Sequence, residues 1–167
     1  MEKLYQQREG NPFHISVGAV AVKEGQILVH RRTKENVPER FAYTLGGLSE
    51  SYVLMHESVE NGEALEDAVV RGLKEEFGAS GTVRKYLGAL SFMHTWSGKT
   101  FEKTILYFLA DITEMSKRPD DMEAWTELAW LSPEALLEKF RYQNERSDRP
   151  ELSEAKIIED YLAYGNS

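Results

Sequence analysis

The sequence contains no cysteine among its 167 residues. This absence excludes disulfide bonds, zinc sites built on thiolates and catalysis by a cysteine nucleophile. No apolar run approaches the ~20 residues of a membrane-spanning helix. The first ten residues, MEKLYQQREG, lack the apolar core of a secretory signal. We therefore expect a cytoplasmic protein with no membrane partner.

Positive charge is also scarce. The chain has 20 Lys and Arg against 28 Asp and Glu, which gives a formal net charge of −8. Such a balance disfavours nucleic-acid polymers and anionic membranes, because phosphate backbones are bound by clustered cations. It remains compatible with a small polyphosphate held through a divalent metal ion. The composition, 41% hydrophobic and 29% charged, is typical of a globular protein, and the length fits a single domain, 1–167.

Alternating hydrophobic residues predict a mixed β-sheet. Short turns of sequence KEG and SGK join two pairs of strand-like runs, which indicates antiparallel hairpins. Because strands alternate with helical segments, we expect an α/β (α+β) fold in which helices cover a mixed sheet. The predicted strands are residues 13–22, 26–32, 41–47, 51–60, 82–96, 100–112 and 128–131, with the long fifth run bent at Gly88.

Three segments carry helix signals. In ENGEALEDAVVRGLKEEFGA, apolar residues recur every four positions from Leu65 to Phe77, which is typical of one buried helix face. Asn61 is the predicted N-cap of this helix and Gly78 its stop. The pair Ser132-Pro133 starts a second helix, and a third is predicted at about 152–164 from its apolar spacing.

The first helix holds two unusual residues. Glu76 falls between Leu65 and Val69 on the helical wheel, inside the apolar face, and Gly72 lies beside it. A buried carboxylate is costly unless it is paired or bound to a metal ion. A lone glutamate at such a position usually turns to solvent or pairs with an arginine. The adjacent Glu75 favours a hard divalent cation, because neighbouring carboxylates otherwise repel each other.

These residues resemble the Nudix box. The family pattern is a glycine, five residues, a glutamate, seven residues, and then R-E-U-x-E-E-x-G-U, in which U is a bulky apolar residue. Here Glu63 is followed by seven residues and then by RGLKEEFGA, which begins at Arg71. The resemblance implies a Nudix-like α/β/α sandwich over most of the chain. It also implies a pyrophosphohydrolase that acts on a nucleoside diphosphate linked to another group, with Mg²⁺ or Mn²⁺ as cofactor.

The resemblance also implies roles for single residues. Glu75 and Glu76 are expected to bind the metal ion, and one of them to help deprotonate water. Arg71 and Glu63 are expected to form a pair that orients them. The partner would be a small nucleotide or diphosphate, and the fold leaves open a homodimer. Another loop often supplies a further acid in this family, and the candidates here are Asp120, Asp121, Glu123 and Glu127.

Two positions depart from the family pattern. Gly72 replaces the glutamate that follows the box arginine, and Glu57 stands where the box opens with glycine, so the usual PGG reads MHE. Three accounts stay open. Glu57 replaces the lost carboxylate as a metal ligand in a working hydrolase. Alternatively, the protein binds a nucleotide or metabolite with little or no hydrolysis, or weak activity persists on Glu75 and Glu76 alone.

Candidate substrate contacts lie on two strands. Arg31 and Arg32 close one strand and are candidates for phosphate binding, although a solvated strand end explains them equally well. His94 and Trp96 alternate with Phe92 on one face of another strand. They are candidates for a base pocket, because bases stack on aromatic rings. Ordinary packing on the sheet is the alternative.

Overall fold

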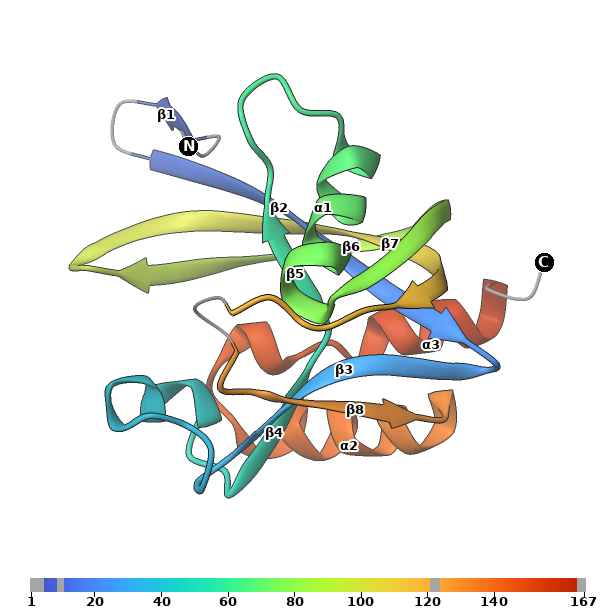
Figure 1. Ribbon diagram of the computed structural model, residues 1–167. Helices are drawn as coiled ribbons and strands as arrows, with labels where there is room; N and C mark the ends of the chain where they lie inside the picture. The colour runs from blue at the N-terminus through green and yellow to red at the C-terminus, as the bar shows by residue number, and fades with distance from the viewer. Residues whose placement is uncertain (1–4, 9–10, 121–123, 165–167) are drawn as a thin grey trace.

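The computed structural model describes residues 5–8, 11–120 and 124–164. Within these residues, eight strands form one mixed sheet with the main path β4-β3-β2-β7-β6 (Figure 1). Strands β2 and β7 pair in parallel, and the other described pairs are antiparallel. The strands are β1 (Tyr5–Arg8), β2 (Asn11–Lys23), β3 (Gln26–Thr33), β4 (Glu50–Val53), β5 (Met55–Ser58), β6 (Ala79–Trp96), β7 (Lys99–Met115) and β8 (Glu127–Leu131).

Helices cover both faces of this sheet. Helix α1 (Leu65–Phe77) lies on one face, and α2 (Pro133–Arg146) and α3 (Ala155–Tyr164) lie on the other (Figure 1). Two hydrophobic cores follow from this arrangement. One joins α1 to the sheet and the other joins α2 and α3 to it. The predicted α/β/α sandwich with a mixed sheet is therefore confirmed.

Of the two predicted ends of helix α1, one is confirmed and the other is wrong. At its C-terminus, Gly78 has a φ of 66° and its N–H reaches the carbonyls of Leu73 and Lys74, so the predicted stop is confirmed. The predicted N-cap at Asn61 is wrong, because the helix begins at Leu65. Residues 60–63 form a turn instead, in which the Glu63 carboxylate accepts the backbone N–H of Glu60 at 3.0 Å.

Other local predictions met mixed outcomes. Ser132 caps α2 by accepting the N–H of Ala135 at 3.2 Å, as predicted. The register of β6 against β7 shifts next to Gly88, so the pairing is irregular where a bend was predicted. The strand predicted at 41–47 is wrong. Residues Glu39–Leu45 form a 3₁₀ helix, η1, which ends at Gly46 with a φ of 60°. A second 3₁₀ turn, η2 (Pro150–Leu152), precedes α3 and delays its start.

A buried polar contact ties the start of α3 to the sheet. Glu154 is fully buried, and its carboxylate accepts hydrogen bonds from the Tyr107 hydroxyl at 2.7 Å and from the Leu54 N–H at 3.0 Å. His56 on β5 contacts the same carboxylate. A Cβ atom at Gly18 would lie 2.6 Å from the Tyr107 ring, so the ring crosses β2 only because that residue is glycine.

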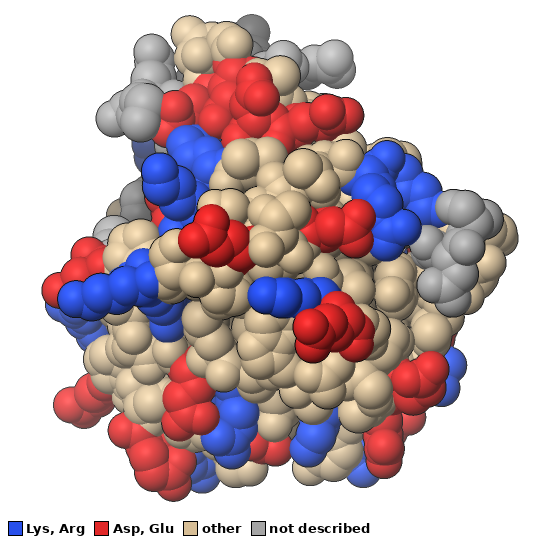
Figure 2. Space-filling view, turned by 45° about the vertical axis from the view of Figure 1, so that its right-hand side comes forward, with Lys and Arg blue, Asp and Glu red and all other residues tan. Residues whose placement is uncertain are grey.

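Acidic side chains gather at one end of the molecule. Figure 2 shows them at the top, the end where Figure 1 places the loop between β5 and α1. This loop and the first turn of α1 contribute Glu60, Glu63, Glu66 and Asp67. In the described part of the chain, no helix is both long and apolar enough to cross a membrane.

Candidate metal and catalytic site

Strand β5 runs directly against the middle of α1. A Cβ atom added at Gly72 would lie 2.8 Å from the Cβ of Glu57 and 2.7 Å from the Sδ of Met55. Both separations are shorter than van der Waals contact, so the strand and the helix approach this closely only because residue 72 is glycine. Gly72 therefore makes room for Glu57, and both departures from the Nudix pattern lie at one contact.

Arg71 gathers the carboxylates around that contact. Its Nε and Nη2 donate to the two oxygens of Glu63 at 2.8 and 3.0 Å, and Nη2 also donates to the Ser58 carbonyl at 2.8 Å. Its Nη1 lies 3.3 Å from Oε1 of Glu57 and 3.4 Å from Oε2 of Glu75. The expected pair of Arg71 with Glu63 is present, and the same guanidinium links Glu57 to Glu75.

The electrostatics of this cluster are strongly negative. Burial raises the pKa of Glu57, Arg71 opposes the rise, and the negative charge of Glu75 adds to it. The hydrogen bond from Arg71 lowers the pKa of Glu63. Glu60 also comes within 3.7 Å of Nη1 of Arg71. Four carboxylates thus share one guanidinium, and a bound cation would relieve the remaining repulsion.

Glu76 faces the sheet. The residue is 8% exposed, and its Oε2 lies 2.6 Å from Nε2 of His30 on β3. Burial lowers the pKa of His30 well below its ordinary value, and the charges of Arg32 and Arg118 lower it further. The contact is a hydrogen bond from Nε2–H of His30 to the Glu76 carboxylate.

Three residues around Glu76 were missed by the sequence analysis: His30, Thr126 and Arg118. His30 is 46 positions from Glu76, and Arg118, which donates to the Glu76 carbonyl, is 42 positions from it. No periodicity links residues so far apart. One signal was available, because His30 shares the inward face of its strand with the buried Leu28.

The two candidate arginines point to opposite faces of the sheet, as adjacent strand residues do. Arg31 forms ion pairs with Glu50 at 2.9 Å and with Glu127 at 2.8 Å. Arg32 is buried on the same face as His30, with its guanidinium 5.9 Å from the centre of the Trp125 ring. The two side chains therefore do not form one phosphate-binding pair.

The candidate acids of the 120–127 loop divide into three groups. Glu127 is paired with Arg31 on the face away from α1. Asp120 makes no hydrogen bond or ion pair within the residues that the structure describes. Asp121 and Glu123 lie outside the described residues.

The aromatic row of β6 packs within the β6–β7 hairpin. The half-buried ring of His94 lies 5.3 Å from that of Phe101 and 6.3 Å from that of Phe92, centre to centre. Burial lowers the pKa of His94, with Lys103 and Arg149 adding to the effect. The side chain of Trp96 lies outside what the structure describes. These contacts agree with packing on the hairpin as the role of His94.

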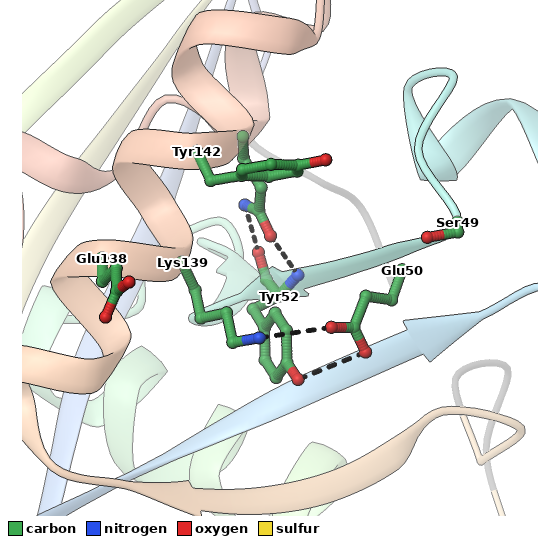
Figure 3. Close-up of a pocket in the computed structure, with 7 residues that line it drawn as sticks. Ser49, Glu50, Tyr52, Glu138, Lys139 and Tyr142 are labelled. Atoms are coloured by element: carbon green, nitrogen blue, oxygen red, sulfur yellow. Dashed lines mark hydrogen bonds and ion pairs between the residues drawn. The ribbon is translucent and has the colours of Figure 1, made fainter.

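A pocket of about 320 Å³ opens on the opposite side of the sheet from α1, between β4 and α2 (Figure 3). Lys139 reaches across it to Glu50, which also accepts the Tyr52 hydroxyl. The pocket is therefore separate from the box residues. Its lining residues are Ser49, Glu50, Tyr52, Glu138, Lys139, Tyr142 and Gln143.

The carboxylates of the box are the type of ligand that a divalent cation prefers. Glu57, Glu75 and Glu76 offer hard oxygen ligands, which Mg²⁺ and Mn²⁺ prefer. In the described residues, no three His, Asp or Glu side chains already stand close enough to hold one ion. Glu57 and Glu75 turn toward Arg71, and Glu76 turns toward His30. In this arrangement the three carboxylates do not meet at a common centre.

Comparison with protein families gives one match. The NUDIX domain model matches residues 12–152, which include both departures from the box. Among curated proteins, MutT4 of Mycobacterium tuberculosis is 28% identical over 88 residues, which is 53% of this chain and 35% of that protein. The matched part of the chain thus spans about a third of the length of this relative.

Solved structures resemble the whole sandwich. A NUDIX hydrolase from Nitrosomonas europaea superposes with a TM-score of 0.60 at 20% identity, covering 90% of this chain and 88% of its own. An ADP-ribose pyrophosphatase from Streptococcus suis gives 0.59 at 14% identity, with 92% of each chain covered. The E. coli ORF135 protein gives 0.56 at 21% identity, covering 90% of this chain and 89% of its own. At these identities the likeness establishes the fold alone.

Proposed function

The chain belongs to the NUDIX domain family, and from this premise we propose that it is a divalent-metal-dependent hydrolase. The bond cleaved would be a pyrophosphate bond in a small nucleoside-diphosphate-linked or related molecule. Glu57, Glu75 and Glu76 would hold Mg²⁺ or Mn²⁺. A metal ion bound there supplies charge neutralisation for the phosphate oxygens and acidifies a water molecule.

One observation carries this proposal. Glu57 lies against Gly72, where only glycine fits, and shares Nη1 of Arg71 with Glu75. The carboxylate missing from residue 72 of α1 is thus replaced by one from β5 at the same contact. This supports a rebuilt site more than a decayed one, because a decayed site has no reason to retain a half-buried carboxylate there.

The chain's own residues have distinct tasks in this proposal. Arg71 orients Glu57 and Glu75 while its bidentate bond to Glu63 fixes the guanidinium. Glu75, with its side chain 52% exposed, is the carboxylate best placed to meet water and to accept a proton from it. Glu76 is held by its hydrogen bond with Nε2 of His30.

The test compares Glu76→Gln and Glu57→Gln with the wild type. We expect both variants to lose the Mn²⁺-dependent rise in melting temperature, and to release phosphate at least about tenfold more slowly from a panel of nucleoside-diphosphate conjugates. Glu138→Gln is the control, because Glu138 is an exposed acid on α2, beyond the sheet from the box.

The competing function is binding of a nucleotide or metabolite without turnover. The observation in its favour is that the described carboxylates are not assembled around one point. A wild-type protein that binds a panel member tightly, yet releases no phosphate from any of them with Mn²⁺ present, would establish that function and reject hydrolysis. An unchanged rate in Glu57→Gln would remove Glu57 from the metal site and leave Glu75 and Glu76 as its carboxylates.

A further inference from the structure

Arg118 lies in the loop between β7 and β8, outside the Nudix box, yet it contacts the box helix. Its Nε donates to the Glu76 carbonyl at 2.6 Å, in the last turn of α1. Its Nη1 donates to the Thr126 carbonyl at 2.6 Å, and its Nη2 donates to the Thr126 hydroxyl at 2.8 Å. One planar guanidinium therefore fixes the end of α1 relative to the residue that precedes β8.

The hydrogen bonds continue from Thr126 to the carboxylate of Glu76. The Thr126 hydroxyl lies 2.7 Å from Nδ1 of His30, and the His30 Nε2 lies 2.6 Å from Oε2 of Glu76. The Thr126 hydroxyl also accepts from Nη2 of Arg118 at 2.8 Å. Hydrogen bonds therefore connect Arg118 to the Glu76 carboxylate through Thr126 and His30.

We propose that Arg118 is a positioning residue, which acts through Thr126 and His30 to hold the Glu76 carboxylate in one orientation for the divalent cation. The inference rests on the proposed function, because it needs Glu76 to be a metal ligand. Histidines and carboxylates behind a metal ligand commonly fix its orientation in this way. Here the fixing group is an arginine from a loop that was expected to supply an acid.

Arg118 is anchored to protein oxygens. Three of the five N–H groups of its guanidinium donate to such oxygens, at 2.6 to 2.8 Å. These bonds orient the side chain toward the last turn of α1 and toward Thr126.

Thr126 offers a matched pair of variants. Thr126→Val keeps the shape of the side chain and removes the hydroxyl, whereas Thr126→Ser keeps the hydroxyl. We expect Mn²⁺ affinity, measured from the free-ion electron paramagnetic resonance signal, to fall about tenfold or more in Thr126→Val and in Arg118→Gln. Thr126→Ser is expected to stay close to the wild type, because its hydroxyl still reaches His30.

Tyr107→Phe controls for stability. This variant loses a buried hydrogen bond on the opposite face of the sheet, so it should unfold more easily while its Mn²⁺ affinity is unchanged. If both Thr126→Val and Arg118→Gln keep the Mn²⁺ affinity of the wild type, this inference is overturned and the proposed function still stands. A wild-type protein with no measurable Mn²⁺ affinity would overturn the proposed function and, with it, this inference. If Thr126→Val and Tyr107→Phe lose Mn²⁺ affinity equally, the loss reflects reduced stability, and the positioning role of Arg118 is also overturned.

Discussion

Arg71 is the residue with the most partners in the candidate site. It is only 21% exposed at the side chain, and its guanidinium is held by Glu63, the Ser58 carbonyl, Glu57 and Glu75. A lysine at this position would keep the charge but would lose the planar fork that makes the bidentate bond to Glu63. At least one buried acceptor would then be left without a donor.

We therefore predict that Arg71→Lys lowers the free energy of unfolding by about 1–3 kcal/mol. Urea denaturation without added metal is the measurement, so that any loss of metal binding does not contribute. The matched control is Arg141→Lys, because Arg141 forms an exposed pair with Glu159 that should contribute little. If both substitutions change stability by the same small amount, the guanidinium fork is not what holds the cluster.

The spacing of the box foretold the pair of Arg71 and Glu63, and it marked Glu57 and Gly72 as linked departures. It could not foretell the partner of Glu76. His30 reaches Glu76 only because its side chain lies on the face of the sheet that α1 covers, and that contact is set by tertiary structure. Arg31 and Arg32 illustrate the same limit. Their adjacency suggested a shared role, whereas the pleat of β3 sends them to opposite faces.

At the scale of elements, the contact between β5 and α1 decides how the site is built. Gly72 costs helix stability, by about 1 kcal/mol relative to alanine. The close approach of the Glu57 Cβ explains why the cost is tolerated. Met55 is the other neighbour, but its sulfur is at the end of a flexible side chain and can move aside.

We predict that Gly72→Ala is destabilising by about 1–3 kcal/mol, despite the higher helix propensity of alanine, because the added methyl overlaps the Cβ of Glu57. Glu57→Gly removes that atom. In the double variant Glu57→Gly/Gly72→Ala, the overlap is relieved, and we expect a favourable coupling of about 1 kcal/mol or more between the two sites.

Denaturant unfolding of the two single variants and the double variant measures this coupling. Additive changes would show that the overlap is absorbed elsewhere and that Glu57 does not explain the glycine. The same overlap affects any attempt to restore the glutamate of the family pattern at position 72. Glutamate at position 72 has the same Cβ as alanine, so a rise in activity from Gly72→Glu is expected only when Glu57→Gly accompanies it.

Most element positions followed from the pattern, and the errors have physical causes. The segment 41–47 was predicted as a short strand. Its hydrogen bonds are local, as in the Thr44 hydroxyl that donates to the Phe41 carbonyl, so it forms η1 instead. Asn61 carries a good capping side chain, but the N–H of Glu63 bonds to the Glu60 carbonyl in a turn, and the helix begins only at Leu65. Local competition of this kind is not visible in hydrophobic spacing.

On the scale of the whole molecule, Glu154 joins elements that are far apart in the chain. The fully buried carboxylate at the start of α3 accepts from Tyr107 on β7 and contacts His56 on β5. The loop that begins α3 is thereby attached to the sheet on the face opposite α1. Burial raises the pKa of Tyr107 well above its ordinary value, and the charge of Glu154 and its hydrogen bond raise it further.

This shift predicts how stability depends on alkaline pH. In the unfolded chain Tyr107 loses its proton at a pH of about 10, whereas the folded protein keeps it, so the folded state binds more protons above that pH. Stability must then fall as pH rises, by up to about 1.4 kcal/mol per pH unit from this group. Tyr107→Phe removes the contribution. The variant should be less stable than wild type at neutral pH, by about 1–3 kcal/mol, because Glu154 loses a donor.

The expected outcome is therefore that the stability gap between wild type and Tyr107→Phe narrows as pH rises from about 9 to 11. Denaturant midpoints at several pH values measure the gap, and Tyr86→Phe is the matched control, because Tyr86 lies exposed on the neighbouring strand β6. The denaturant midpoint of Tyr86→Phe should change with pH in the same way as that of the wild type. A gap between wild type and Tyr107→Phe that stays constant would mean that Tyr107 ionises in the folded protein as it does in the unfolded chain. The buried contact would then not be the feature that anchors α3 to the sheet at high pH.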